Sequence, residues 1–164
     1  MKICIKAGII LFTILLELLL SNFLVLNTIK PDLILIVVIC MSLISGPEEG
    51  TAVGFIGGML KDIFSVHYLG VNALVKTVIG YIAGLTREKI FPQHLMWIVV
   101  ISTFVFTLAN NMAVYFILKA LHTDYDFSNI LQNIIFSQAI LNCVLSPFVF
   151  VGINKIFTYG KRWS

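Results

Sequence analysis

The stretch Gly50–Gly70 reads GTAVGFIGGMLKDIFSVHYLG and sets two charged side chains inside an apolar, glycine-rich run. Lys61 and Asp62 are adjacent in this stretch. Charge at membrane depth is expensive, so residues of this kind pair with one another or mark a functional path. The first question is therefore what balances these two charges.

Small residues recur on one helical face in each of two successive segments. In the first segment the stripe consists of Gly50, Gly54, Gly57 and Gly58, with Asp62 as its next position. In the second segment it consists of Ala73, Thr77, Gly80 and Gly84, with Lys76 on the same side. Faces of this kind let helix backbones approach closely in lipid. The two segments are predicted to pack against each other through these faces.

The dipeptide Leu69–Gly70 provides the turn between the two segments. Asp62 lies seven residues before Leu69, and Lys76 lies seven residues after it, so the two side chains reach a similar depth. We predict an antiparallel hairpin in which Asp62 pairs with Lys76, while Lys61 either shares Asp62 or extends outward along its stem. The pair is either a structural lock or an ion, proton or substrate site.

The composition excludes an ordinary soluble domain. Of 164 residues, 59% are hydrophobic and 12% are charged, against a charged share of about 25% in soluble domains. The three cysteines are far apart and have no metal-ligand spacing. The basic residues are scattered at the ends of apolar runs, which argues against nucleic-acid binding. The sequence predicts an all-α integral membrane protein without a metal or cofactor.

Six apolar segments form one predicted membrane domain over residues 1–164. The expected spans are residues 7–27, 32–45, 51–66, 71–86, 95–118 and 130–153. Pro31 and Asp32 begin the second span, since proline suits the first turn and an acid suits the positive end of the helix dipole. The second and third spans are short, so they are either shielded by neighbours or set in a thin region. Five spans remain an alternative if the short segments are re-entrant.

Lysine and arginine in the short loops set the predicted orientation. With both termini in the cytoplasm, that side holds Lys2, Lys6, Arg87, Lys89, Lys155, Lys161 and Arg162. The outer side then holds Lys30 and Lys119. Because the inverse orientation reverses this bias, we expect both termini inside. The first segment is predicted to be retained as a span, since Glu17 interrupts it and no cleavage-site pattern follows.

Further polar residues interrupt the other spans. They are Glu17 in the first span, Asn110 and Asn111 in the fifth, and Gln138, Asn142 and Ser146 in the last. Such groups hydrogen-bond between helices or line a ligand cavity. The sequence contains no HExxH, GxSxG or phosphate-loop motif. We therefore predict a protein without enzymatic activity.

These motifs resemble the MreD family of bacterial rod-shape-determining membrane proteins. The resemblance is strongest from Pro31 to Phe91 and rests on Pro31–Asp32, GTAVGFIGGMLKDIFS, LGVNALVKTVIGYIAG and the REKIF loop. The glycine-rich helix of the family ends in an aspartate, which Asp62 matches, and the LG turn that follows matches Leu69–Gly70. Lys61 and Lys76 depart from the apolar residues expected at their positions.

The resemblance implies a non-enzymatic scaffold of the cell-elongation machinery in the bacterial cytoplasmic membrane. Its implied partner is the bitopic protein MreC, with MreB and peptidoglycan synthases as indirect partners and lipids around it. The glycine-faced spans would offer docking surface to partner helices. The family is also similar in size and topology to substrate-binding subunits of energy-coupling-factor transporters. This likeness gives an alternative, a vitamin-binding transporter subunit, and an ion-coupled carrier using Asp62 is a third possibility.

Overall fold

A computed structural model describes residues 8, 13, 30–64, 69–89, 95–121 and 135–161 of the chain. Its elements are α2 (Leu33–Ser45), α3 (Pro47–Phe64), α4 (Val71–Leu85), the short 3₁₀ helix η1 (Thr86–Lys89), α5 (Leu95–Ala120) and α7 (Phe136–Lys161). The predicted all-α fold is confirmed for the described residues. The predicted first span lies outside them, except for Gly8 and Thr13, which are both helical.

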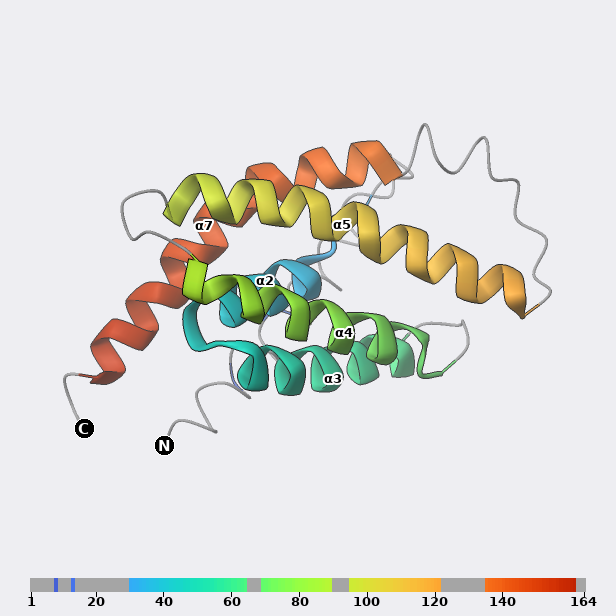
Figure 1. The fold of residues 1–164 in the computed structure, drawn as a ribbon, viewed down its shortest axis with the longest axis horizontal. Helices are drawn as coiled ribbons and strands as arrows, with labels where there is room; N and C mark the ends of the chain where they lie inside the picture. The colour runs from blue at the N-terminus through green and yellow to red at the C-terminus, as the bar shows by residue number, and fades with distance from the viewer. Residues whose placement is uncertain are drawn as a thin grey trace.

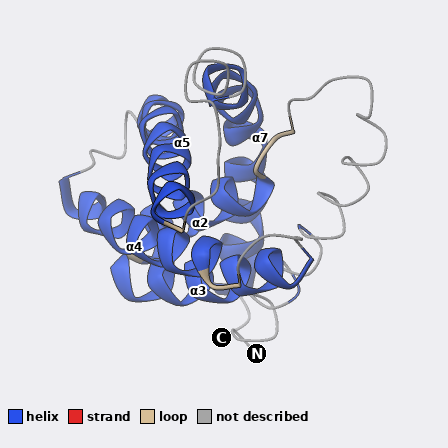
Figure 2. Cartoon of the chain, turned by 90° about the vertical axis from the view of Figure 1, so that its right-hand side faces the viewer, coloured by secondary structure: helices blue, strands red, loops and turns tan. Residues whose placement is uncertain are grey.

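Helix α2 is the centre of the bundle. It contacts α3, α4, α5 and α7, and Figures 1 and 2 show it between the α3–α4 pair and the α5–α7 pair. Its residues from Leu33 to Leu43 are all buried. The helix has 13 residues and is therefore about 20 Å long, less than the ~30 Å of a bilayer core. Of the two explanations for its shortness, shielding by neighbouring helices is the one observed.

Helices α3 and α4 form an antiparallel hairpin and lie side by side in Figures 1 and 2. Helix α3 begins at Pro47, so the predicted loop SGPEEG contains its first turn, where Glu48 and Glu49 face the positive dipole end. Gly70 at the start of α4 has φ +98°, a left-handed conformation that glycine adopts without strain. The turn predicted at Leu69–Gly70 is therefore in place.

Helices α5 and α7 pack together on the other side of α2 (Figure 1). Among the described residues, these two are long and apolar enough to cross a membrane, over Met96–Ala120 and Phe136–Ile156. Many of their large apolar side chains point outward, including Trp97, Ile101, Phe116, Val144 and Phe148. An outward apolar surface on long helices suits lipid surroundings. Helix α7 contains Pro147 and changes direction along its length in Figure 1, as expected of a helix with an internal proline.

Candidate functional site

The glycines of α3 and α4 bring the two backbones into contact. A Cβ atom added to Gly50 would lie 2.5 Å from the carbonyl oxygen of Gly80, and one added to Gly58 would lie 2.6 Å from that of Asn72. A Cβ atom on Gly54 would collide with the main chain of Lys76. The opposing main chain leaves no room for a side chain at these positions.

The predicted glycine stripe of α3 contacts two neighbouring helices, α4 and α2, rather than α4 alone. A Cβ atom added to Gly57 would lie 2.8 Å from a methyl group of Ile34 in α2. On α4, a Cβ atom added to Gly84 would collide with Pro47 at the start of α3. The stripe residues therefore face inward, toward α4 at Gly54 and Gly58 and toward α2 at Gly57.

The carboxylate of Asp62 caps the start of α4. Its two oxygens accept hydrogen bonds from the main-chain N–H groups of Gly70 (2.9 Å), Asn72 (3.1 Å) and Ala73 (3.0 Å), and from Nδ2 of Asn72 (2.9 Å). Asp62 is completely buried. The first N–H groups of a helix lack internal partners and carry its positive dipole end. Because Gly70 has no side chain to cap α4, Asp62 supplies the cap from the neighbouring helix.

Among the described residues, Lys76 has a charged partner in Asp32 at the start of α2. Nζ of Lys76 lies 2.8 Å from Oδ2 of Asp32, and the Lys76 side chain is completely buried. It also donates to Oδ1 of Asn72 (3.3 Å) and Oδ1 of Asn110 (3.4 Å). This corrects the predicted pairing of Lys76 with Asp62. The depth argument considered only the hairpin, whereas α2 brings a carboxylate to the same level and the N–H groups of α4 take up Asp62.

Asp32 joins three helices through one side chain. Its Oδ1 accepts from the N–H of Leu35 and caps α2 (3.0 Å), while its Oδ2 lies 2.9 Å from Nζ of Lys61 as well as near Lys76. Its own N–H donates to Oδ1 of Asn142 in α7 (3.0 Å). The sequence identified Asp32 only as a helix start. This end of the hairpin has two lysines, Lys61 and Lys76, but one aspartate, Asp62. That surplus of lysine could have indicated a second acid from another segment.

The network continues into α5 and α7 through amide side chains. Asn142 donates to Oγ1 of Thr107 (3.1 Å), and Asn111 donates to Oε1 of Gln138 (2.7 Å). Gln138 in turn donates to the carbonyl oxygen of Lys30 (2.6 Å). Among the described residues, every buried side-chain nitrogen and oxygen has a hydrogen-bond partner. We call these connected side chains of α2, α3, α4, α5 and α7 the polar network.

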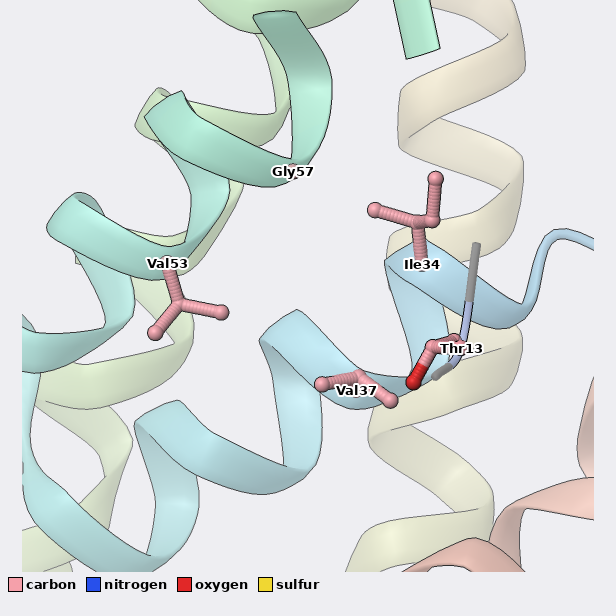
Figure 3. Close-up of a pocket in the computed structure, with 5 residues that line it drawn as sticks. All are labelled: Thr13, Ile34, Val37, Val53 and Gly57. Atoms are coloured by element: carbon pink, nitrogen blue, oxygen red, sulfur yellow. The ribbon is translucent and has the colours of Figure 1, made fainter. Parts of the chain in front are cut away.

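A small pocket beside Gly57, separate from the polar network, is apolar. It lies between α2 and α3 and is lined by Ile34, Val37, Val53, Gly57 and Thr13 (Figure 3). Thr13 contributes a hydroxyl group, and the other lining side chains are aliphatic or absent. Within the described part of the chain, no group of three or more histidine, cysteine, aspartate or glutamate side chains could hold a metal ion.

The fold and the polar network define an all-α membrane protein in which the buried charged residues Asp32, Asp62 and Lys76 are bound inside the helix bundle. The chain belongs to the MreD family: the model of the rod shape-determining protein MreD matches residues 2–156. The predicted resemblance is thereby confirmed, and it gives the chain a role in rod-shape determination. Comparisons with curated proteins and with solved structures gave no match.

Proposed function

We propose that the protein is a non-enzymatic scaffold of the cell-elongation machinery, spanning the bacterial cytoplasmic membrane several times. The family assignment supports a role in cell shape, and the excess of lysine and arginine on one side supports cytoplasmic termini. In this arrangement the six apolar segments form a single domain. Asp32, Asp62 and Lys76 then lie toward the outer surface, at the end of the bundle where α2 and α4 begin.

The observation that carries this proposal is the saturation of the polar network. Asp62 accepts four hydrogen bonds from the start of α4, and Lys76 has Asp32, Asn72 and Asn110 around its ammonium group. A substrate or ion site needs polar groups that are turned toward a cavity. These groups are turned toward one another, which favours a structural lock that fixes five helices.

A rigid bundle of this kind offers its outer faces to partners and lipids. Helix α4 has a stripe of exposed apolar side chains at helical spacing, namely Leu74, Val78, Tyr81, Ile82 and Leu85. A bitopic partner similar to MreC has a single membrane helix that can pack on such a face, while the inward glycines hold the face in place. MreB and peptidoglycan synthases would be reached indirectly through this partner.

Purification from native membranes tests this proposal. The tagged protein should retain an MreC-like bitopic protein, and its depletion should turn rod-shaped cells round. Replacing Leu74 and Val78 with tryptophan should weaken partner retention. The same change at Ile101, an exposed apolar residue of α5, is the matched control. A vitamin-binding transporter subunit would instead carry a small molecule and gain thermal stability of RT ln(1 + [L]/Kd) from it. That result without a retained partner would contradict the scaffold.

A further inference from the structure

Helix α7 has a break in its backbone hydrogen bonding at Pro147. A proline has no N–H group, so the carbonyl oxygen of Cys143, four residues earlier, loses its usual partner. The hydroxyl group of Ser146 donates to this oxygen instead, at 3.0 Å. In a membrane helix a serine side chain can satisfy a carbonyl group that a proline leaves unpaired. Ser146 therefore stabilises α7 at the point where the helix bends (Figure 1).

The half of α7 before the proline, residues 136–146, is held by directional contacts. Asn142 accepts from the N–H of Asp32 (3.0 Å) and donates to Oγ1 of Thr107 (3.1 Å), so it joins α7 to α2 and to α5. The thiol of Cys143 donates to the carbonyl oxygen of Val100 in α5 (3.5 Å). Hydrogen bonds depend on distance and angle, so a rotation of this half would break them. The first half of α7 is therefore fixed to its neighbours.

The half of α7 after the proline, residues 148–161, packs on the bundle through apolar side chains. Phe150 and Ile153 are buried and belong to the same apolar core as the residues of α2. On the other side of this half, Phe148, Val151 and Ile156 are exposed. Apolar contact is non-directional, so packed helices can slide by small amounts and keep it. The contact of the second half with the core therefore tolerates small movements, and its exposed face leaves room for them among the described helices.

We propose that Ser146 and Pro147 form a hinge, about which the second half of α7 swings along α2 while the first half stays in place. Pro147 weakens the helix at one point, because both its missing N–H group and its ring disturb the preceding turn. Ser146 keeps the carbonyl group of Cys143 satisfied through a side chain, which can follow a change in the bend. The helix rises about 14 Å from Pro147 to Ile156, so a swing of about 20° moves Ile156 by about 5 Å.

The hinge goes beyond the scaffold proposed above and does not depend on the identity of a partner. The polar network lies before the hinge, whereas the exposed Lys155 lies near the end of the second half. In the proposed orientation that end of α7 is on the cytoplasmic side. A swing at the hinge would therefore change the shape of the cytoplasmic surface and leave the polar network intact.

Distances between two spin labels on the full chain in lipid nanodiscs test the hinge. Leu74→Cys on α4 is the fixed reference, and the second label replaces one exposed residue of α7 at a time, namely Ile140, Val144, Val151 or Ile156. The native cysteines are removed by Cys4→Ala, Cys40→Ala and Cys143→Ser, the last of which keeps a donor for Val100. The distance distributions should be equally narrow at Ile140 and Val144 and wider by several ångström at Ile156. Equal widths at all four positions would overturn the hinge.

Two substitutions test whether the motion originates at Ser146 and Pro147. Pro147→Ala restores the N–H group and should narrow the distribution at Ile156. Ser146→Ala leaves the carbonyl group of residue 143 unpaired and should widen it. Ser137→Ala, in the first half of α7, is the matched control and should change neither. A width at Ile156 that responds to neither substitution would place the motion elsewhere and overturn the proposal. If a variant fails to fold, the comparison of the four label positions in the parent chain still decides.

Discussion

The α3–α4 hairpin and the α5–α7 pair associate by different means. In the hairpin, glycines bring two backbones together, as at Gly54 and the main chain of Lys76. Between α5 and α7, side chains mediate the contact through Asn142 and Thr107 and through the edge-to-face rings of Phe104 and Phe136, whose centroids are 6.0 Å apart. Apolar burial gives little drive for helix association within lipid. The hairpin is therefore sensitive to added volume, while the α5–α7 pair is sensitive to the loss of individual polar contacts.

The largest expected effect is that of Gly54→Leu in the hairpin. The new side chain collides with the main chain of Lys76, which cannot rotate away as a side chain could. We expect a loss of about 3 kcal/mol or more, at the upper end of the range for overpacked sites. Gly152→Leu on α7 is the matched control, because nothing lies within 4 Å of a Cβ atom there. Size-exclusion profiles of the two variants in detergent measure the folded fraction, and equal profiles would contradict backbone contact in the hairpin.

Removal of the buried ammonium group should have the next largest effect. Lys76→Met leaves Asp32 with Lys61 as its described charged partner and deprives Asn72 and Asn110 of a donor. Breaking a buried ion pair from one side costs about 3–5 kcal/mol. Because Lys61 remains beside Asp32, we expect a loss at the lower end, about 3 kcal/mol. Unfolding in SDS measures it. The matched change Lys61→Met should cost less, since that side chain is partly exposed; a larger loss at Lys61 would reverse the assigned order.

Asp62→Asn should have an intermediate effect on the hairpin. Asparagine keeps one carbonyl oxygen but turns an NH₂ group toward the N–H donors at Gly70 and Ala73. Buried donors without acceptors cost about 1–3 kcal/mol, so we expect about 2 kcal/mol of destabilisation in SDS unfolding. If Asp62→Asn remained as stable as the wild type and kept its partner but lost the cell-shape function, Asp62 would be a functional site and not a lock.

The smallest expected effect lies between α5 and α7. Thr107→Val removes the acceptor of Asn142 while preserving the shape of the side chain. Interhelical hydrogen bonds in membrane proteins average about 0.6 kcal/mol, so the loss should be close to this value in the same assay. A loss as large as that of Asp62→Asn would remove the contrast between the two helix pairs.

The sequence predicted the local features of the hairpin but not its charge pairing. Glycine spacing and the Leu69–Gly70 turn are short-range signals, so the contact of α3 with α4 followed from them. The pairing of Lys76 with Asp32 joins residues that are 44 positions apart. It depends on the position of α2 among four other helices, and helical periodicity within one segment contains no information on that position. The short length of α2 left shielding by neighbours or a thin membrane region as alternatives, and it contained no information on which helices shield it.

The account of the polar network as a lock is tested most directly by the coupling between Asp32 and Lys76. Asp32→Asn, Lys76→Met and the double variant are compared by SDS unfolding in the same bicelles, with partner retention measured on each. The account predicts that the double variant is more stable than Lys76→Met alone, because the carboxylate left without Lys76 is removed as well. Additive losses of stability, or unchanged stability with the partner lost, would contradict it.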